Sequence, residues 1–322
     1  MDVFEKNILE LGRQLSLKNL RFFNEARLRK YRPDVIAVIG MGGSGTVGLV
    51  LKKISKDVSI QIPVIAWNDY GLPPEIEGGC FKRPLLVFVS FSGNTEETLD
   101  GFAKAARYGR RAVVTGGGKL MEAAKKSGDP LAVFEKYDLA PRQANGVMLY
   151  GALGLLKNSL PKIKIDSPSV NPAKYRELGK KISAAIGKKN VVVYTTTANS
   201  HLGYLWKAHL NETGKVAAFS NVIPEMNHNE IVAFETKPKN FIACLIKGGG
   251  ENSNERHRLN ITEKILSRFG VPTIIISPSG KTAIEKTFNL VSLAQWTAYF
   301  TAKARGISPL ETKSIDLIKK LI

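Results

Sequence analysis

The segment from Leu85 to Thr98 constrains the fold of this 322-residue chain more than any other stretch. It begins with the continuous apolar run Leu85–Val89, which is typical of a strand buried on both faces of a parallel sheet. The run then changes to Ser, Ser, Gly, Asn and Thr and continues as a helical pattern. Asn94 followed by Glu97 fits a capping box, so we expect a helix to begin here. The segment therefore predicts a strand, a hydroxyl-rich loop and a helix.

The hydroxyl side chains of this loop, Ser90, Ser92 and Thr95, suggest an anion site. Short hydroxyls and free backbone N–H groups converge where a strand end meets a helix start, and this arrangement suits a phosphate. Glu96 and Glu97 weaken the interpretation, because carboxylates in the first helical turn would repel a phosphate. We favour a cradle for a phosphate monoester, and the alternative of a capped loop without a ligand stays open.

A second glycine-rich loop, Gly40–Gly45, lies between the buried-strand run Val35–Ile39 and an apolar helix at Thr46–Ile54. Its pattern G-x-G-x-x-G matches the dinucleotide fingerprint, and Asp69 lies where an acid that binds ribose is expected. Ser44, however, adds a hydroxyl, and two hydroxyl-bearing loops on one sheet fit a compact phosphate better than an extended dinucleotide. No Lys-Ser or Lys-Thr pair follows either glycine cluster, which excludes a P-loop.

Strands and helices alternate along the chain, which predicts an α/β fold with two doubly wound, flavodoxin-like parallel sheets. We expect an amphipathic helix within residues 1–30 and a longer apolar helix at 140–160. A strand, a hydroxyl-rich turn and a helix recur at 191–211, which suggests a duplication. The predicted strands are residues 35–39, 62–66, 85–89, 112–115, 191–194, 216–219, 241–246 and 273–276.

Residues 161–172 contain three prolines and few candidate core residues, which indicates a linker. We therefore expect a phosphate-binding N-terminal domain at 1–160 and a C-terminal domain at 173–322 that ends in a helix.

Composition narrows the class of partner. The 47 Lys and Arg exceed the 28 Asp and Glu and give a formal charge of +19, which suits nucleic acid, an acidic surface or a small anionic substrate. No motif supports nucleic acid, and no apolar stretch approaches the roughly 20 residues that span a bilayer. Only Cys80 and Cys244 are present, so we expect a cytoplasmic protein, although a single bridge between them stays open. The four histidines lack metal-ligand spacing.

Two residues in the second half are candidates for acid–base chemistry. Glu212 is predicted at a helix C-terminus, where the macrodipole disfavours a carboxylate anion and raises its proton affinity, as suits a base. His228 is flanked by polar residues in Asn-His-Asn-Glu. Each also has an ordinary interpretation, an exposed glutamate and a structural histidine.

Several motifs together resemble one family, the bifunctional phosphoglucose/phosphomannose isomerases of archaea, built from two sugar-isomerase (SIS) domains. They are Gly-Met-Gly-Gly-Ser-Gly at 40–45, Ser-Phe-Ser-Gly-Asn-Thr-Glu-Glu-Thr at 90–98, Pro-Arg-Gln at 141–143, the segments around Glu212 and His228, and Ile-Asp-Leu-Ile-Lys at 315–319. The hydroxyl-rich segment marks the superfamily. Glu212, His228 and the C-terminal lysine narrow the resemblance from the superfamily to this family.

The resemblance implies roles for individual residues. Arg142 resembles the arginine that stabilises the enediolate, and Glu212 resembles the base that moves a proton between C1 and C2. The residues that resemble the phosphate-holding groups are Gly43, Ser44, Ser90, Ser92 and Thr95.

Three further residues are implied in ring opening and specificity. His228 resembles the ring-opening histidine, which in this family comes from the neighbouring subunit, so a homodimer is implied. Lys319 resembles the lysine that assists ring opening, and Thr312 resembles the threonine that leaves room for either C2 epimer.

The resemblance thus implies an enzyme that interconverts glucose 6-phosphate and mannose 6-phosphate with fructose 6-phosphate through ring opening and a cis-enediolate. We expect no metal or cofactor, and no nucleic-acid or membrane partner. Three alternatives remain: a non-catalytic phosphosugar regulator, a nucleotide-dependent oxidoreductase, and a single-substrate phosphoglucose isomerase.

Overall fold

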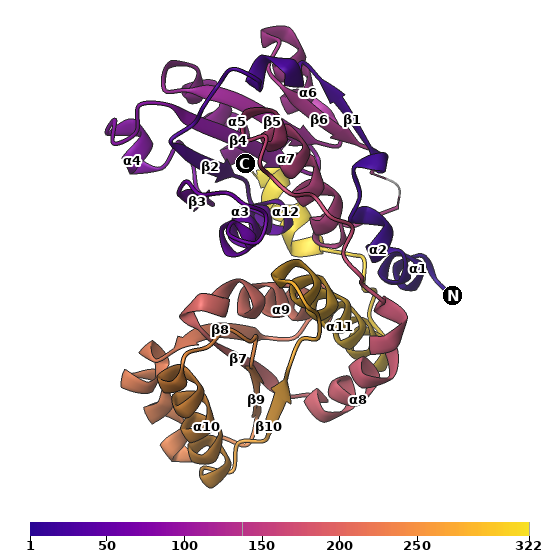
Figure 1. The fold of residues 1–322 in the computed structure, drawn as a ribbon. Coiled ribbons are helices and arrows are strands. Elements are labelled where there is room, and N and C mark those ends of the chain that lie inside the picture. Colours follow the sequence, from indigo (N-terminus) through magenta and orange to yellow (C-terminus); the bar gives the residue numbers. More distant parts are fainter. Residues whose placement is uncertain (137, 322) are drawn as a thin grey trace. The chain divides into compact units, whose positions relative to one another are not determined.

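A computed structural model describes residues 1–136 and 138–321 and divides the chain into two compact units (Figure 1). The N-terminal unit is residues 10–169, and the C-terminal unit is residues 1–9 together with the chain from Val170 onward. The division falls inside the proline-rich segment 161–172. Unlike the predicted domains, helix α1 (Val3–Leu9) belongs to the C-terminal unit, because Phe4 and Ile8 are buried in its core.

The N-terminal unit contains a six-stranded sheet in the order β1-β6-β5-β4-β2-β3, with β1 antiparallel to β6 and the other strands parallel. From β2 the chain passes to β3 on one side and then to β4, β5 and β6 on the other. The strand order therefore reverses between β2 and β4, the place where ligands bind in open α/β sheets. The strands are β1 (Leu20–Phe23), β2 (Val35–Ile39), β3 (Val64–Trp67), β4 (Pro84–Ser90), β5 (Arg110–Thr115) and β6 (Leu131–Phe134).

Helices cover both faces of this sheet (Figure 1). Every residue of β4 is buried, and Leu86 and Phe88 pack with Phe102 of α5 and Leu120 of α6. Each such side chain stabilises the fold by roughly 1.5–3 kcal/mol relative to exposure. The helices are α2 (Leu11–Gln14), α3 (Gly42–Ile54), α4 (Pro74–Glu77), α5 (Glu96–Lys104), α6 (Gly118–Ser127) and α7 (Asn145–Ser159), with short 3₁₀ turns η1 (Leu17–Asn19), η2 (Glu25–Leu28), η3 (Ala105–Arg107) and η4 (Pro141–Gln143).

The C-terminal unit contains a parallel four-stranded sheet in the order β10-β9-β7-β8. Val191 and Val193 of β7 face the core that includes α8, α9 and α11, whereas Val192 and Tyr194 face the core that includes α10. This alternation is expected of a strand buried on both faces. The strands are β7 (Asn190–Thr196), β8 (Ala218–Ile223), β9 (Phe241–Ile246) and β10 (Thr273–Ile276).

The order β8-β7-β9-β10 repeats the order β3-β2-β4-β5 of the other unit. The predicted repeat and the predicted class, two doubly wound parallel sheets, are therefore confirmed. The helices of this unit, besides α1, are α8 (Arg176–Ile186), α9 (Ser200–Glu212), α10 (Ser253–Arg268), α11 (Ala283–Ala304) and α12 (Lys313–Leu321), with 3₁₀ turns η5 (Pro172–Tyr175), η6 (Thr197–Asn199), η7 (Glu225–His228) and η8 (Glu230–Thr236). None of the helices within 1–136 and 138–321 combines the length and apolarity needed to cross a membrane.

Two local predictions are wrong. Residues 1–30 do not form the predicted single helix. They contain α1, α2 and the strand β1, which pairs with β6 at the sheet edge. The capping box of Asn94 and Glu97 does not form: α5 begins at Glu96 with Thr95 as its N-cap, and Asn94 Oδ1 instead accepts a hydrogen bond from the Lys119 N–H at 3.0 Å.

Candidate active site

The loops after β2 and β4 meet in the N-terminal unit where its strand order reverses. Ser44 Oγ, in the first turn of α3, accepts a hydrogen bond from the Phe91 N–H at 3.0 Å and so joins the two loops. Ser90 Oγ lies 2.9 Å from Thr95 Oγ1 and accepts from the Gly93 N–H at 3.0 Å.

Ser92 Oγ accepts from the Asn94 N–H at 3.1 Å, so its hydroxyl belongs to the same folded loop. The structure thus gathers the predicted phosphate-binding hydroxyls at the C-terminal ends of β2 and β4, beside the N-termini of α3 and α5. We name these two joined loops, residues 40–45 and 90–95, the phosphate cradle, because they form the candidate phosphate site.

Arg142 lies against this cradle. A Cβ on Gly43 would come within 2.8 Å of the Pro141 carbonyl oxygen and 3.1 Å of Arg142 Cα, so only glycine allows η4 to pack this closely. Arg142 is buried, with 3% of its surface exposed. The Gly43 carbonyl also accepts a hydrogen bond from Asn145 Nδ2 at 3.0 Å. The six predicted residues of this unit, five in the cradle and Arg142, therefore lie together.

Lys136 is a cation at the cradle that no sequence motif singles out. Its Nζ donates to the Ser92 carbonyl at 3.3 Å, and it follows β6, a strand absent from the prediction. Glu96 and Glu97 lie in the first turn of α5, as the sequence indicates. No local motif marks Lys136, since β6 alone brings it there.

In the C-terminal unit the strand order reverses between β7 and β9, and a carboxylate of the chain itself occupies this position. In the loop after β9, Glu251 is 6% exposed and accepts hydrogen bonds from Asn199 Nδ2 at 2.9 Å and from the Gly249 N–H at 3.0 Å. A carboxylate at this position would repel a phosphate. The reversal in the N-terminal unit therefore stays the candidate phosphate site.

Glu212 is the last residue of α9, at a helix C-terminus as predicted. It lines a pocket of about 580 Å³ in the C-terminal unit that Thr312 also lines. The two residues are 100 positions apart, and no short-range signal relates them. The lining includes Glu212, Lys215, Ile307, Glu311, Thr312 and Lys313.

Tyr204 lies on the same helix as Glu212. Burial raises the pKa of the Tyr204 phenol, and the negative charge of Glu212 raises it further. Both effects favour the protonated, uncharged form of the phenol.

His228 and Lys319 do not line this pocket. α9 ends at Glu212 before β8 begins, whereas His228 is exposed in η7 after β8 ends. The six residues of β8 span roughly 20 Å, and Glu212 precedes this strand whereas His228 follows it, so the two residues lie near its opposite ends. Lys319 is exposed on α12, which contributes only its first turn to the pocket.

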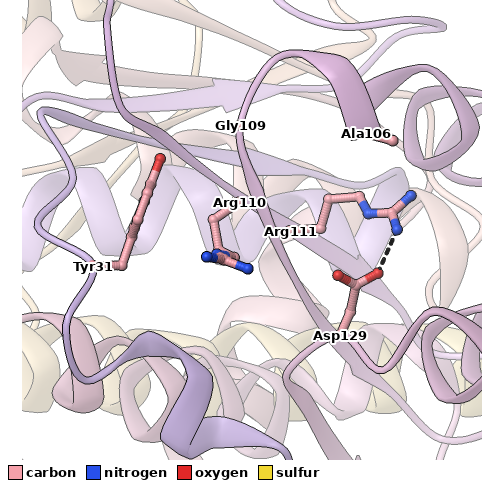
Figure 2. Close-up of a pocket in the computed structure, with 6 residues that line it drawn as sticks. All are labelled: Tyr31, Ala106, Gly109, Arg110, Arg111 and Asp129. Atoms are coloured by element: carbon pink, nitrogen blue, oxygen red, sulfur yellow. Dashed lines mark ion pairs between the residues drawn. The ribbon is translucent and has the colours of Figure 1, made fainter.

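A second pocket, of about 350 Å³, lies in the N-terminal unit at the start of β5, the end opposite to the cradle (Figure 2). Arg111 pairs with Asp129 at 2.7 Å, and the Tyr31 hydroxyl donates to the Pro84 carbonyl at 2.9 Å. Figure 2 shows Arg110 between Tyr31 and this ion pair. The ion pair joins the start of β5 to the segment before β6, and the Tyr31 hydrogen bond joins the segment before β2 to the start of β4. The pocket holds none of the predicted site residues. Within residues 1–136 and 138–321, no group of three or more His, Cys, Asp or Glu side chains could hold a metal ion.

Comparison with known proteins defines the class first. A solved structure titled a putative phosphosugar isomerase, from Clostridium difficile 630, covers 100% of this chain and 99% of its own at a TM-score of 0.72 and 14% identity, so the fold is shared. Residues 176–322 match the family model described as "Bacterial phospho-glucose isomerase C-terminal SIS domain". The chain is therefore a two-unit protein of the SIS class.

Relatives define the family. The bifunctional phosphoglucose/phosphomannose isomerase of Aquifex aeolicus is 35% identical over 311 residues, which cover 93% of this chain and 95% of that protein. A D-glucosamine-6-phosphate 4-epimerase of Sulfolobus acidocaldarius is 30% identical over 66% of this chain and 68% of its own. Because the first match spans nearly all of both proteins, this chain belongs to the bifunctional phosphoglucose/phosphomannose isomerase family.

Proposed function

We propose that the chain interconverts glucose 6-phosphate and mannose 6-phosphate with fructose 6-phosphate. The observation that carries this function is the match to a bifunctional isomerase over 93% of the chain. The chain is accordingly an aldose–ketose isomerase, an intramolecular oxidoreductase. We further assign to the two units the roles of phosphate binding, for the N-terminal unit, and of proton transfer, for the C-terminal unit.

The phosphate cradle holds the sugar phosphate in this proposal. Hydroxyls and first-turn amides of α3 and α5 suit a phosphate monoester, and Lys136 adds positive charge. Binding energy at the phosphate, far from the reacting carbons, holds C1 and C2 in register. Arg142, buried beside Gly43, supplies the cation that stabilises the enediolate oxygen.

Glu212 acts as the base in this proposal. It removes the proton on C2 of the open-chain aldose, and the enediolate accepts a proton at C1 while another moves from O2 to O1. A carboxylate suits this transfer because the proton lies α to a carbonyl. Thr312, in the same pocket as Glu212, leaves room for either configuration at C2.

Ring opening requires an acid and a base near O5 and O1, which we assign to His228 and Lys319. The position of His228 at the end of β8 opposite to Glu212 favours its action in the site of a second copy. We therefore propose a homodimer. We also propose that the enzyme is cytoplasmic and that it requires no metal or cofactor.

A coupled assay tests the function: production of fructose 6-phosphate from glucose 6-phosphate and from mannose 6-phosphate, each with excess chelator. We expect turnover of both aldoses. Tight binding without turnover would instead identify a phosphosugar regulator, and turnover of glucose 6-phosphate alone would identify a single-substrate isomerase. Parallel incubation with D-glucosamine 6-phosphate tests epimerisation at C4, which we expect to be absent.

A further inference from the structure

Lys215 joins the two walls of the pocket that contains Glu212. It follows α9 by three residues, and its ammonium donates hydrogen bonds to the backbone carbonyls of Glu212 and Glu311, the second at 2.6 Å. Glu212 carries the proposed base, and Glu311 directly precedes Thr312. One side chain therefore connects the base residue to the segment that carries the proposed specificity residue.

Helix geometry explains the first of these contacts. The last carbonyls of an α-helix have no intrahelical partner and carry partial negative charge, so a lysine ammonium is favourable there. The second contact is not local, because Glu311 is 96 residues further along the chain. The ammonium thus sets the separation between the end of α9 and the segment before α12.

The backbone of Lys215 is itself held in place. Arg305 Nη1 donates to the Lys215 carbonyl at 2.9 Å, and Arg305 Nη2 donates to the Gly187 carbonyl at 2.9 Å. Lys215 has a left-handed φ of 51°, which directs its side chain back across the end of α9. A methionine would meet the same backbone strain, so Lys215→Met changes the ammonium alone.

Resting on the proposed function, we infer that Lys215 is a positioning residue that sets the distance between Glu212 and Thr312, and thereby the relative turnover of the two C2 epimers. If the hydrogen bonds of Lys215 were purely structural, their removal would change the stability of the protein. It would leave the preference between two sugars that differ only at C2 unchanged.

The experiment measures kcat and KM for glucose 6-phosphate and mannose 6-phosphate in the wild type, Lys215→Met and Lys215→Arg. Loss of a hydrogen bond that fixes a wall of the site is expected to change the ratio of the two kcat/KM values about three- to tenfold. Lys215→Arg, which keeps the charge and the donors, should restore most of the wild-type ratio.

Lys313→Met is the matched control. Lys313 lines the same pocket and pairs with the exposed Glu311 carboxylate at 3.1 Å, so its removal changes the pocket charge equally. We expect it to leave the ratio unchanged.

An unchanged ratio in Lys215→Met, or an equal change in Lys313→Met, overturns the inference. Lys215 is exposed, so we expect the variant to fold. Lys215→Ala, which removes both hydrogen bonds of the side chain, provides the same ratio test should the methionine variant fail to fold. A wild type that turns over neither sugar contradicts the proposed function itself, a result distinct from an unchanged ratio.

Discussion

The hydroxyl oxygen of Ser44 and the backbone N–H of Phe91 are joined by a hydrogen bond of 3.0 Å, although the residues are 47 positions apart. This bond connects the glycine-rich loop after β2 to the hydroxyl-rich loop after β4. It explains why Ser44 stands in a loop that otherwise resembles a dinucleotide fingerprint, since the serine draws the two loops into one compact cradle.

Ser44→Ala should weaken substrate binding. The change leaves the Phe91 N–H without its acceptor, at a cost of about 1–3 kcal/mol, and loosens the cradle. Because the phosphate is bound equally in ground and transition states, we expect KM to rise about tenfold for both aldoses with a smaller effect on kcat. Ser127→Ala, an exposed hydroxyl on α6, serves as the control. An unchanged KM would argue against the cradle.

Thr46→Val should impair the placement of Arg142. Thr46 Oγ1 donates to the Gly43 carbonyl at 2.6 Å and accepts from Asn145 Nδ2 at 2.5 Å, so it links α3 to the segment that carries Arg142. Valine keeps the shape and removes the hydroxyl, and we expect kcat to fall about tenfold. Thr46→Ser keeps the hydroxyl and should retain wild-type kcat. Equal behaviour of the two variants would refute this link.

Thiol titration should detect one cysteine per folded chain. Cys80 is exposed, whereas Cys244 is buried in β9, and burial raises the pKa of its thiol to about 12. The reactive thiolate of Cys244 is therefore scarce at pH 8, and we expect one reacting thiol in the native protein and two after unfolding. In Cys80→Ser, no thiol should react before unfolding. Rapid reaction of both thiols would contradict the burial of Cys244.

Mixing two inactive variants should restore activity if His228 acts across a dimer. In a heterodimer of Glu212→Gln and His228→Ala, one site would combine Glu212 of the second chain with His228 of the first, both intact. Random pairing should then give about a quarter of wild-type activity in a two-fold symmetric dimer. A mixture as inactive as its components would assign His228 to its own chain or remove it from the mechanism.

The sequence predicted those features of the fold that local periodicity records. Leu85–Val89 is typical of a strand buried on both faces, and β4 is buried throughout. β1 was missed because its four residues alternate in burial at an edge and owe their strand form to pairing with β6. The helix start near Asn94 was found, but Asn94 serves a different loop, a contact 25 residues away that no capping pattern reveals.

The candidate site likewise contains residues that short motifs predicted and residues that only tertiary packing brings together. The cradle hydroxyls lie in two short motifs, so their gathering at the strand-order reversal followed from topology. Glu212 and Thr312 share a pocket through tertiary packing, and Lys136 and Lys215 join their sites through backbone carbonyls. Any residue presents such carbonyls, so neither lysine has a sequence signature.

Replacement of Glu212 by glutamine tests the central claim most directly, because the amide has the shape of the carboxylate but cannot accept the proton. The measurement is the exchange of the C2 hydrogen with deuterated solvent, together with calorimetric binding of fructose 6-phosphate. We predict that exchange and isomerisation fall about 10²–10⁴-fold while the Kd changes less than about threefold. Exchange at the wild-type rate in Glu212→Gln would contradict the account.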